Sequence, residues 1–339
     1  MTDHFSPLQR CAASAADIIG MTPMVALDRI TAGTGGQILA KCEFLNPGFS
    51  KKDRFARQVI EDAEHDGRLK PGQTVVELTS GNTGTGLAIV CGVKGYPFVA
   101  VMSKGNSSER ARMMQALGAE VVLVDQCASS IVGQVSGEDL ERVETETQRL
   151  VKERCAFRAD QFNNWSNERA HLLHTGPEMV EQSAGKITAF CDFAGTAGSF
   201  AGCARALRNH NPSIACYLVE PAGAAALKGE TITRPGHRIQ GGGYARSSLT
   251  FLDGLRVDGH LTITDDEAVH GARRLAKEEG LFTGFSSGAN LAAALKLLAG
   301  PCRGGIVAII LNDSGLKYLS TGLWDSPLST QSIPPVVAL

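Results

Sequence analysis

The stretch Asn46-Pro47-Gly48-Phe49-Ser50-Lys51-Lys52-Asp53-Arg54 separates two segments of different hydrophobic periodicity. Before it, residues 37–44 form a short apolar run of the kind found in buried strands. After it, Phe55, Val59 and Ala63 recur every four residues, which is the spacing of one face of a helix. The stretch therefore predicts a strand, a turn and an amphipathic helix in succession.

The start of this helix determines what Lys52 can do. Pro47-Gly48 marks a turn, and Ser50 with Asp53 three residues later predicts a capping pair at the helix N-terminus. Lys52 would then lie in the first turn, where the helix dipole and any burial lower the pKa of its amine. A less protonated amine suits Schiff-base chemistry, although on the local pattern alone a lysine near a helix start is more often a solvated surface residue.

The composition limits the classes of function. A chain of 339 residues predicts two domains or one large α/β unit, and 43% hydrophobic residues are ample for a core. The formal net charge of −2 gives no reason to expect nucleic acid or an anionic membrane as a partner. The first residues lack the pattern of a secretory signal, and the longest apolar runs are too short to span a bilayer. We therefore expect a cytoplasmic protein whose partners are small molecules.

The nine cysteines are scattered, and no Cys-x-x-Cys pair occurs. Most lie in apolar runs, where a thiol behaves as a small hydrophobic group, so we expect reduced core cysteines. His171 and His174 have a spacing found in metal sites, but no cluster of carboxylates or cysteines accompanies them. The sequence therefore predicts no metal.

Short apolar runs alternate with helical periodicity along the chain. The strand candidates are residues 38–44, 74–78, 98–102, 120–124, 187–193, 215–220, 261–264 and 305–311. The helix candidates are residues 53–66, 83–94, 107–117, 198–208, 265–279 and 288–298. This alternation predicts an α/β fold in which helices cover parallel, twisted sheets on both faces.

The alternation is interrupted between Gln126 and Arg154. A polar loop there is followed by Leu140, Val143, Thr147 and Leu150 at helical spacing, while the intervening charges predict a solvated outer face. A domain crossing is expected shortly afterwards, near residues 157–167. Residues 325–339 contain Pro and Ser and are expected to form a loosely held tail.

Three glycine-rich turns each lie between a predicted strand and a predicted helix. They are Thr79-Ser80-Gly81-Asn82-Thr83-Gly84, Gly195-Thr196-Ala197-Gly198-Ser199 and Gly284-Phe285-Ser286-Ser287-Gly288. Such turns suit anion binding by backbone N–H groups, but a tight strand–helix turn also uses Gly for structural reasons alone. None matches the dinucleotide fingerprint, which speaks against a nicotinamide dehydrogenase.

Taken together with the lysine stretch, these turns resemble the pyridoxal-phosphate (PLP) enzymes of the tryptophan-synthase-β fold, known as fold type II. Within that fold the sequence is most similar to the cysteine synthase family, which includes the cystathionine β-synthases. The resemblance extends from about Ile19 to Thr321. Further matching motifs are Ser107-Ser108-Glu109-Arg110, Asp160-Gln161-Phe162-Asn163, His174-Thr175-Gly176-Pro177-Glu178 and Lys317-Tyr318-Leu319-Ser320-Thr321.

The resemblance implies a role for each matching residue. Lys52 would form the Schiff base with PLP and act as the base at the substrate α-carbon. Asn82 would bind the ring 3′-oxygen of the cofactor, and Ser286 would face the pyridine nitrogen. The phosphate would be held by Gly195, Thr196, Ala197, Gly198 and Ser199, and the substrate carboxylate by Thr79, Ser80, Thr83 and Gln161.

The resemblance also implies two domains with the cofactor between them. Residues 45–160 would form a smaller, mobile domain that closes over the substrate, and residues 14–44 plus 161–324 a larger PLP-binding domain. A homodimer is implied as well.

The expected reaction is β-replacement on an activated serine, giving cysteine or a related β-substituted alanine. The serine hydroxyl of Ser286 cannot stably protonate the ring nitrogen, which makes the cofactor a weaker electron sink and favours loss of a β-leaving group. The alternative with the same cofactor is β-elimination, deaminating serine, threonine or cysteine. A relative without catalytic activity is disfavoured because Lys52 and the phosphate loop are both present.

Several positions depart from the family pattern. Phe49 and Lys51 stand where small and apolar residues are usual, and Ala197 replaces a customary Gly. The segment from Ile239 to Ser248 lacks the usual entrance motif and adds Arg246, which could recognise an anionic second substrate or simply be an exposed loop residue. The length of the 126–154 segment also exceeds the family norm.

Overall fold

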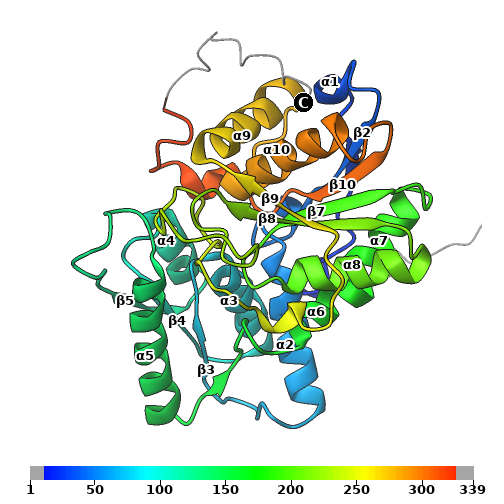
Figure 1. Cartoon of the computed structure of the whole chain (residues 1–339). Coiled ribbons are helices and arrows are strands. Elements are labelled where there is room, and N and C mark those ends of the chain that lie inside the picture. Colours follow the sequence, from blue (N-terminus) through cyan, green and yellow to red (C-terminus); the bar gives the residue numbers. More distant parts are fainter. Residues whose placement is uncertain (1–10, 326–339) are drawn as a thin grey trace, which may run out of the picture.

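Two separate sheets organise residues 11–325, which are the residues that the computed structural model describes (Figure 1). One sheet has six strands in the order β1-β2-β10-β7-β8-β9, and the other has four in the order β5-β4-β3-β6. All neighbouring strands are parallel except β1 and β2. The predicted α/β fold with helix-covered parallel sheets is confirmed, with one antiparallel edge strand added.

The six-stranded sheet is buried on both faces, as expected for Val- and Ile-rich parallel strands. Its strands are β1 (Met24–Ala26), β2 (Gln37–Lys41), β7 (Ala189–Phe193), β8 (Ala215–Pro221), β9 (Gly259–Ile263) and β10 (Ile306–Ile310). One face packs against α1 (Asp28–Thr31), α9 (Asp265–Glu279) and α10 (Phe285–Ala299). The opposite face packs against α7 (Gly176–Gln182) and α8 (Gly198–His210).

The four-stranded sheet has its own two-sided core. Its strands are β3 (Val75–Leu78), β4 (Phe98–Ser103), β5 (Glu120–Val124) and β6 (Phe157–Arg158). On one face lie α2 (Lys52–His65), α3 (Asn82–Lys94) and α4 (Ser108–Ala116), and on the other lies α5 (Gly137–Glu153). We propose that this sheet belongs to a smaller domain of residues 45–160 and the six-stranded sheet to a larger one of residues 14–44 plus 161–324.

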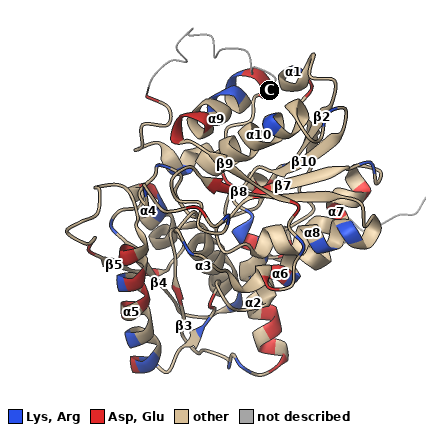
Figure 2. Ribbon diagram, viewed as in Figure 1, with Lys and Arg blue, Asp and Glu red and all other residues tan. Residues whose placement is uncertain are grey.

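Helix α5 has the one-sided character predicted from its sequence. Leu140, Val143, Thr147 and Leu150 are buried against the small sheet. Apart from the buried capping residue Asp139, its charged residues are exposed or half-buried, and Figure 2 shows that they occur along the whole helix. A capping box starts the helix, in which the Ser136 hydroxyl accepts a hydrogen bond from the Asp139 backbone N–H.

Some elements differ from the prediction. The strand expected over residues 38–44 ends at Lys41 and is followed by the short 3-10 helix η2 (Glu43–Leu45). Strands β1 and β6 were not predicted because three- and two-residue strands carry no periodicity. Also unpredicted were α6 (Ser166–Ala170), the π-helical turn η3 (His171–Thr175), α7, and the 3-10 turns η4 (Thr250–Leu252) and η5 (Gly315–Tyr318).

The tail expected over residues 325–339 lies outside the described residues apart from Asp325. Within residues 11–325, no helix combines the length and hydrophobicity needed to cross a bilayer.

Candidate active site

Lys52 is the first residue of α2 and is only 9% exposed. Its Nζ donates a hydrogen bond of 3.3 Å to Oγ1 of Thr196, which lies in the turn between β7 and α8. The interpretation of Lys52 as a solvated surface lysine is therefore wrong. Folding instead brings the lysine stretch against a glycine-rich turn far along the chain.

The surroundings of Lys52 lower the pKa of its amine to about 7. Burial is the largest cause, and the positive charge of Lys51 adds to it. The carboxylates of Asp192 and Glu77 act in the opposite direction. At neutral pH a large fraction of the amine is therefore unprotonated and nucleophilic.

The predicted capping pair of Ser50 and Asp53 is wrong. Lys51 occupies the N-cap position without a side-chain cap. The Asp53 carboxylate accepts the backbone N–H of Gly48, while the Ser50 hydroxyl accepts the N–H of Lys52 at 3.3 Å. The physical reason is that Ser50 is held in a bridge with Asp313, which starts the helix one residue later than a Ser50 cap would.

The turn Gly195-Thr196-Ala197-Gly198-Ser199 leads from β7 into α8, which begins at Gly198. The first N–H groups of a helix have no partner within the helix, so they are available to an anion. Thr196 Oγ1 accepts hydrogen bonds from Asn167 (2.9 Å) and Lys52 (3.3 Å), which leaves its own proton to donate. The Ser199 hydroxyl, in contrast, donates to Asp192 Oδ2 at 2.6 Å.

Two of the departures from the family pattern have left-handed backbone conformations. Phe49 has φ of 61° and Ala197 has φ of 64°. Glycine adopts this region without penalty, whereas other residues lose about 1–2 kcal/mol there. The customary Gly at position 197 therefore has a conformational reason, and this chain tolerates backbone strain at Phe49 and at Ala197.

Asn82 is the first residue of α3, and both ends of its amide are held. Lys317 Nζ donates to its Oδ1 at 2.7 Å, and its Nδ2 donates to Asp313 Oδ2 at 2.8 Å. Asp313 also accepts the hydroxyl of Tyr318 at 2.7 Å. The amide is thus fixed in one orientation, with its second N–H left for a ligand.

Sequence reasoning did not identify Asp313, although one signal was available. Asp313 follows the carboxyl end of β10, and the carboxyl ends of parallel strands are where sites form in α/β folds.

The residues expected to bind a substrate carboxylate meet at the carboxyl end of β3. Thr83 Oγ1 donates to Gln161 Oε1 at 2.6 Å, and Thr79 Oγ1 accepts the N–H groups of Gly81 and Gly84. The Ser80 hydroxyl lies 2.7 Å from the hydroxyl of Tyr244.

Ser286 lies in the first turn of α10 and is 8% exposed. The turn preceding α10 is close to the Asn82 cluster, because a Cβ placed on Gly284 would meet Asp313 Oδ1 at 2.3 Å.

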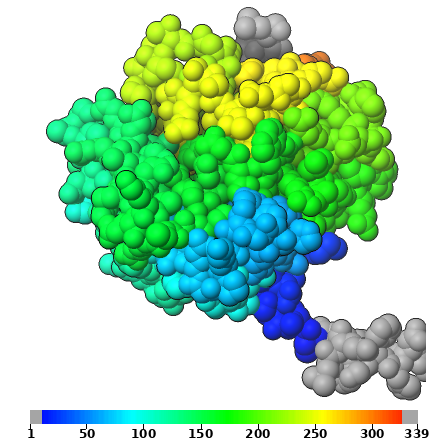
Figure 3. All heavy atoms as spheres, turned by 90° about the horizontal axis from the view of Figure 1, so that it is seen from below, coloured from blue at the N-terminus to red at the C-terminus, as the bar shows by residue number. Residues whose placement is uncertain are grey.

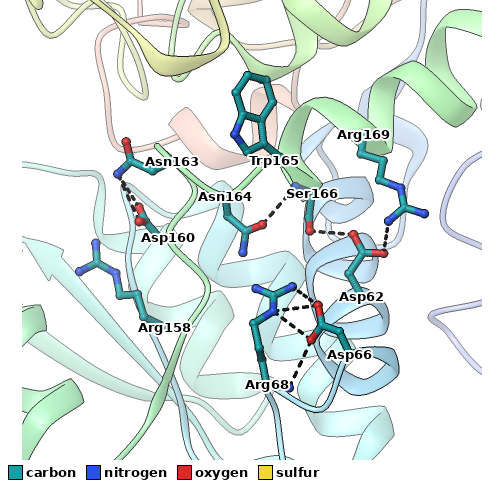
Figure 4. Close-up of a pocket in the computed structure, with 10 residues that line it drawn as sticks. All are labelled: Asp62, Asp66, Arg68, Arg158, Asp160, Asn163, Asn164, Trp165, Ser166 and Arg169. Carbon is teal, nitrogen blue, oxygen red and sulfur yellow. Dashed lines mark hydrogen bonds and ion pairs between the residues drawn. The ribbon is translucent and has the colours of Figure 1, made fainter.

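A separate cavity of about 560 Å³ contains none of the predicted site residues. It lies where the end of α2 borders the segment after β6, two regions that adjoin on the face seen in Figure 3. Figure 4 shows Arg68 paired with Asp66, Arg169 with Asp62, and Asp160 bonded to Asn163. Arg158 is paired with Glu144, which lies outside the lining, at 2.7 Å. We therefore assign no chemistry to it.

His171 is fully buried, and its Nδ1 lies 2.9 Å from the Thr175 hydroxyl. Over residues 11–325 no group of three or more His, Cys, Asp or Glu side chains is arranged to hold a metal ion. Five of the cysteines, Cys42, Cys91, Cys191, Cys203 and Cys216, are buried free thiols.

Known proteins resemble this chain over most of its length. A family model described as pyridoxal-phosphate dependent enzyme matches residues 15–313. A cysteine synthase of Staphylococcus aureus is 37% identical over 318 residues, covering 93% of this chain and 98% of the relative.

Solved structures agree with this match. O-acetyl serine sulfhydrylase isoform 3 from Entamoeba histolytica has a TM-score of 0.85 and 34% identity, covering 96% of this chain and 95% of that chain. O-ureido-L-serine synthase has a TM-score of 0.83 and 37% identity, covering 95% of this chain and 98% of that chain. The resemblance inferred from the motifs is confirmed.

Proposed function

This chain belongs to the pyridoxal-phosphate dependent enzymes, and on that basis we propose which of its residues bind the cofactor and the substrate. With PLP the enzyme performs β-replacement on an activated serine such as O-acetylserine, giving cysteine or a related β-substituted alanine. The observation that carries the residue assignment is the buried Lys52 amine in contact with Thr196 of the phosphate loop.

The residues around Lys52 fit a phosphate-bearing aldehyde. The start of α8 offers backbone N–H groups that have no carbonyl partner within the helix, beside an amine whose pKa is lowered to about 7. Position 198 has no room for a side chain, because a Cβ there would lie 2.5 Å from the Asn167 side chain. We propose that Gly195, Thr196, Ala197, Gly198 and Ser199 bind the phosphate, Ser199 through its backbone N–H because its hydroxyl donates to Asp192.

When bound, PLP supplies an aldehyde for Schiff-base formation and a ring that stabilises negative charge at the substrate α-carbon. Lys52 would hold the cofactor and take the proton from the substrate α-carbon, which an amine with a pKa of about 7 does readily at neutral pH. Asn82 would donate its free N–H to the ring oxygen, and Ser286 would face the ring nitrogen. Thr79, Ser80, Thr83 and Gln161 would orient the substrate carboxylate.

These contacts say less about where the second substrate binds. Arg246 is exposed, but it lines the same small cavity as Gly195, and its guanidinium lies 4.4 Å from the centroid of the Phe162 ring. Val132 and Gln134 of the long 126–154 segment line a cavity of about 370 Å³ together with Phe285, the neighbour of Ser286. We propose that both features shape the entrance for the second substrate; β-elimination remains the alternative outcome when no nucleophile enters.

We also infer a cytoplasmic homodimer. The exposed apolar side chains of Met21 (77%) and Leu45 (56%) support a protein–protein contact, and the bond from Gly20 N–H to Asn46 Oδ1 places them near each other. Light scattering would give the oligomeric state.

The first test of the proposed function is spectroscopic. The purified protein should be yellow, and O-acetylserine should shift its visible band within the mixing time of the experiment. Sulfide, thiosulfate, homocysteine and small amines, added separately, should then restore the band, fastest with the physiological nucleophile. A colourless protein, or a band that O-acetylserine leaves unchanged, would contradict the proposal.

A second test concerns the phosphate loop. Gly198→Ala should weaken PLP binding about 10-fold or more, because the added methyl group displaces Asn167 and with it Thr196, and a hydrogen bond to a charged group contributes about 1.5–3 kcal/mol. Absorbance titration of the stripped protein with PLP measures the affinity. Gly137→Ala is the control, since its Cβ would meet its nearest neighbour at 3.6 Å. If Gly198→Ala and Gly137→Ala bound PLP with equal affinity, the assignment of this loop to the phosphate would be wrong.

A further inference from the structure

Lys51 and Asp192 form a buried ion pair next to Lys52, and the family resemblance gives neither residue a role. Lys51 Nζ lies 2.7 Å from Asp192 Oδ2. Lys51 is 8% exposed and Asp192 is fully buried in β7. The pair joins the start of α2 to the strand that leads into the phosphate loop, across 141 positions of sequence.

Asp192 is also the centre of a hydrogen-bond network. Its Oδ2 accepts the Ser199 hydroxyl at 2.6 Å, and its Oδ1 accepts Nδ2 of Asn290 at 3.0 Å. Asn290 in α10 donates in addition to the carbonyl oxygen of Ile310 at 2.8 Å. One carboxylate therefore connects helix α2, the phosphate loop, α10 and β10.

We propose that Lys51 and Asp192 are positioning residues that act as a unit: their ion pair fixes Lys52 against the phosphate loop and places one positive and one negative charge near its amine. The proposal rests on the proposed function, since it assumes that Lys52 is the lysine that binds PLP.

A purely structural role explains this pair poorly. Removing two charges from water costs several kcal/mol per ion, and well-packed apolar residues of similar size are often as stable or more stable.

The charged and titratable groups facing Lys52 come from four elements. They are Lys51 at the N-cap of α2, Asp192 in β7, Glu77 in β3 and His171 in η3. Burial and Lys51 lower the pKa of Lys52, whereas Asp192 and Glu77 raise it, and burial keeps the pKa of His171 far below its ordinary value. The two members of the pair therefore have opposite effects on the same amine.

The decisive experiment measures the charge state of Lys52 directly. Full-length protein is stripped of PLP with hydroxylamine and mixed with PLP across a pH range. The amine condenses with the aldehyde, with loss of water, and the rate of the yellow, borohydride-reducible adduct follows the unprotonated fraction of Lys52. In the unmodified protein we expect the midpoint of this rate profile near the pKa of about 7.

The variants should move this midpoint in opposite directions. Lys51→Met should raise it by about one pH unit and Asp192→Asn should lower it by a similar amount, which is the effect of one nearby charge. The double variant should return close to the original value. Lys51→Arg, which keeps the charge, should leave the midpoint unchanged.

Lys41→Met is the matched control for loss of a buried lysine. Lys41 is fully buried and lies 2.6 Å from Glu178, yet it is not among the groups that shift the pKa of Lys52. The rate profile of the Lys41→Met variant should have the same midpoint as that of the unmodified protein, even if the variant is less stable. Shifts in the same direction for Lys51→Met and Asp192→Asn, or no shift in either, would overturn the proposal.

Failure of the proposed function has a different signature. If Lys52 did not bind PLP, the unmodified protein itself would form no reducible adduct at Lys52. If Asp192→Asn does not fold, Lys51→Met compared with Lys51→Arg still decides whether the charge at position 51 shifts the profile.

Discussion

Replacing Lys52 with Ala is expected to abolish the yellow band and to lower turnover of O-acetylserine by about 10³-fold or more. The variant loses both the amine that holds PLP and the base that takes the substrate α-proton. Folding should survive, because the hydrogen bond of the Lys52 side chain to Thr196 is long, at 3.3 Å, and the side chain forms no ion pair within residues 11–325. Absorbance spectra, steady-state rates and thermal unfolding of the same preparation measure the three effects.

Lys94→Ala is the control for this substitution. Lys94 is paired with Glu64 at the protein surface, with 26% of its side chain exposed. Its spectrum and turnover should match those of the unmodified protein. A Lys52→Ala variant that stayed yellow or kept full turnover would show that another group performs this chemistry.

Replacing Arg54 with Met should lower the free energy of unfolding by about 3–5 kcal/mol, the effect of removing one partner from a buried ion pair. Its Nε donates to Glu43 and its Nη1 donates to Glu178, each at 2.7 Å. Both carboxylates would remain in the interior without this partner. Denaturant unfolding measures the loss, and Arg57→Met, from an exposed pair with Glu61 on the same helix, should lose less than about 1 kcal/mol.

The Arg54 effect should depend on pH. Burial alone would raise the pKa of Glu43, but the Arg54 guanidinium outweighs it and holds that pKa below its ordinary value. Glu43 therefore stabilises the unmodified protein above the ordinary pKa, and this contribution is lost as the pH falls through the lower folded-state pKa.

Without Arg54, burial makes the Glu43 carboxylate easier to protonate. The stability deficit of the variant should consequently shrink between pH 7 and pH 5. A deficit that is constant over this range would mean that Arg54 acts through packing rather than charge.

The sequence predicted best those parts of the fold in which periodicity is regular. The alternation around β4 and the one-sided pattern of α5 are both found in the structure. Residues 166–182 were missed because the helical stretch is divided by a π-helical turn and has Pro at the start of α7, which reads as a break. The predicted cap at Ser50 failed because a long-range bridge to Asp313 determines where α2 begins.

For the candidate site, too, local sequence patterns were recognised and long-range contacts were not. Lys52 and residues 195–199 could be proposed as site residues from the sequence because each lies in a short motif with a local signature, and the structure brings them together. The contacts of Asp313 with Asn82 and of Asp192 with Lys51 were missed because they join residues far apart in sequence. Spacing within one chain cannot reveal a pair of this kind before the fold is known.

Borohydride reduction of the holoenzyme followed by peptide fragmentation tests the central claim most directly. Reduction fixes PLP to the amine that holds it, and fragmentation distinguishes Lys51 from Lys52. We expect the label on Lys52 alone, in a peptide that begins or ends near Arg54. A label on Lys51, on another lysine, or on none would contradict the assignment of Lys52 as the residue that binds the cofactor.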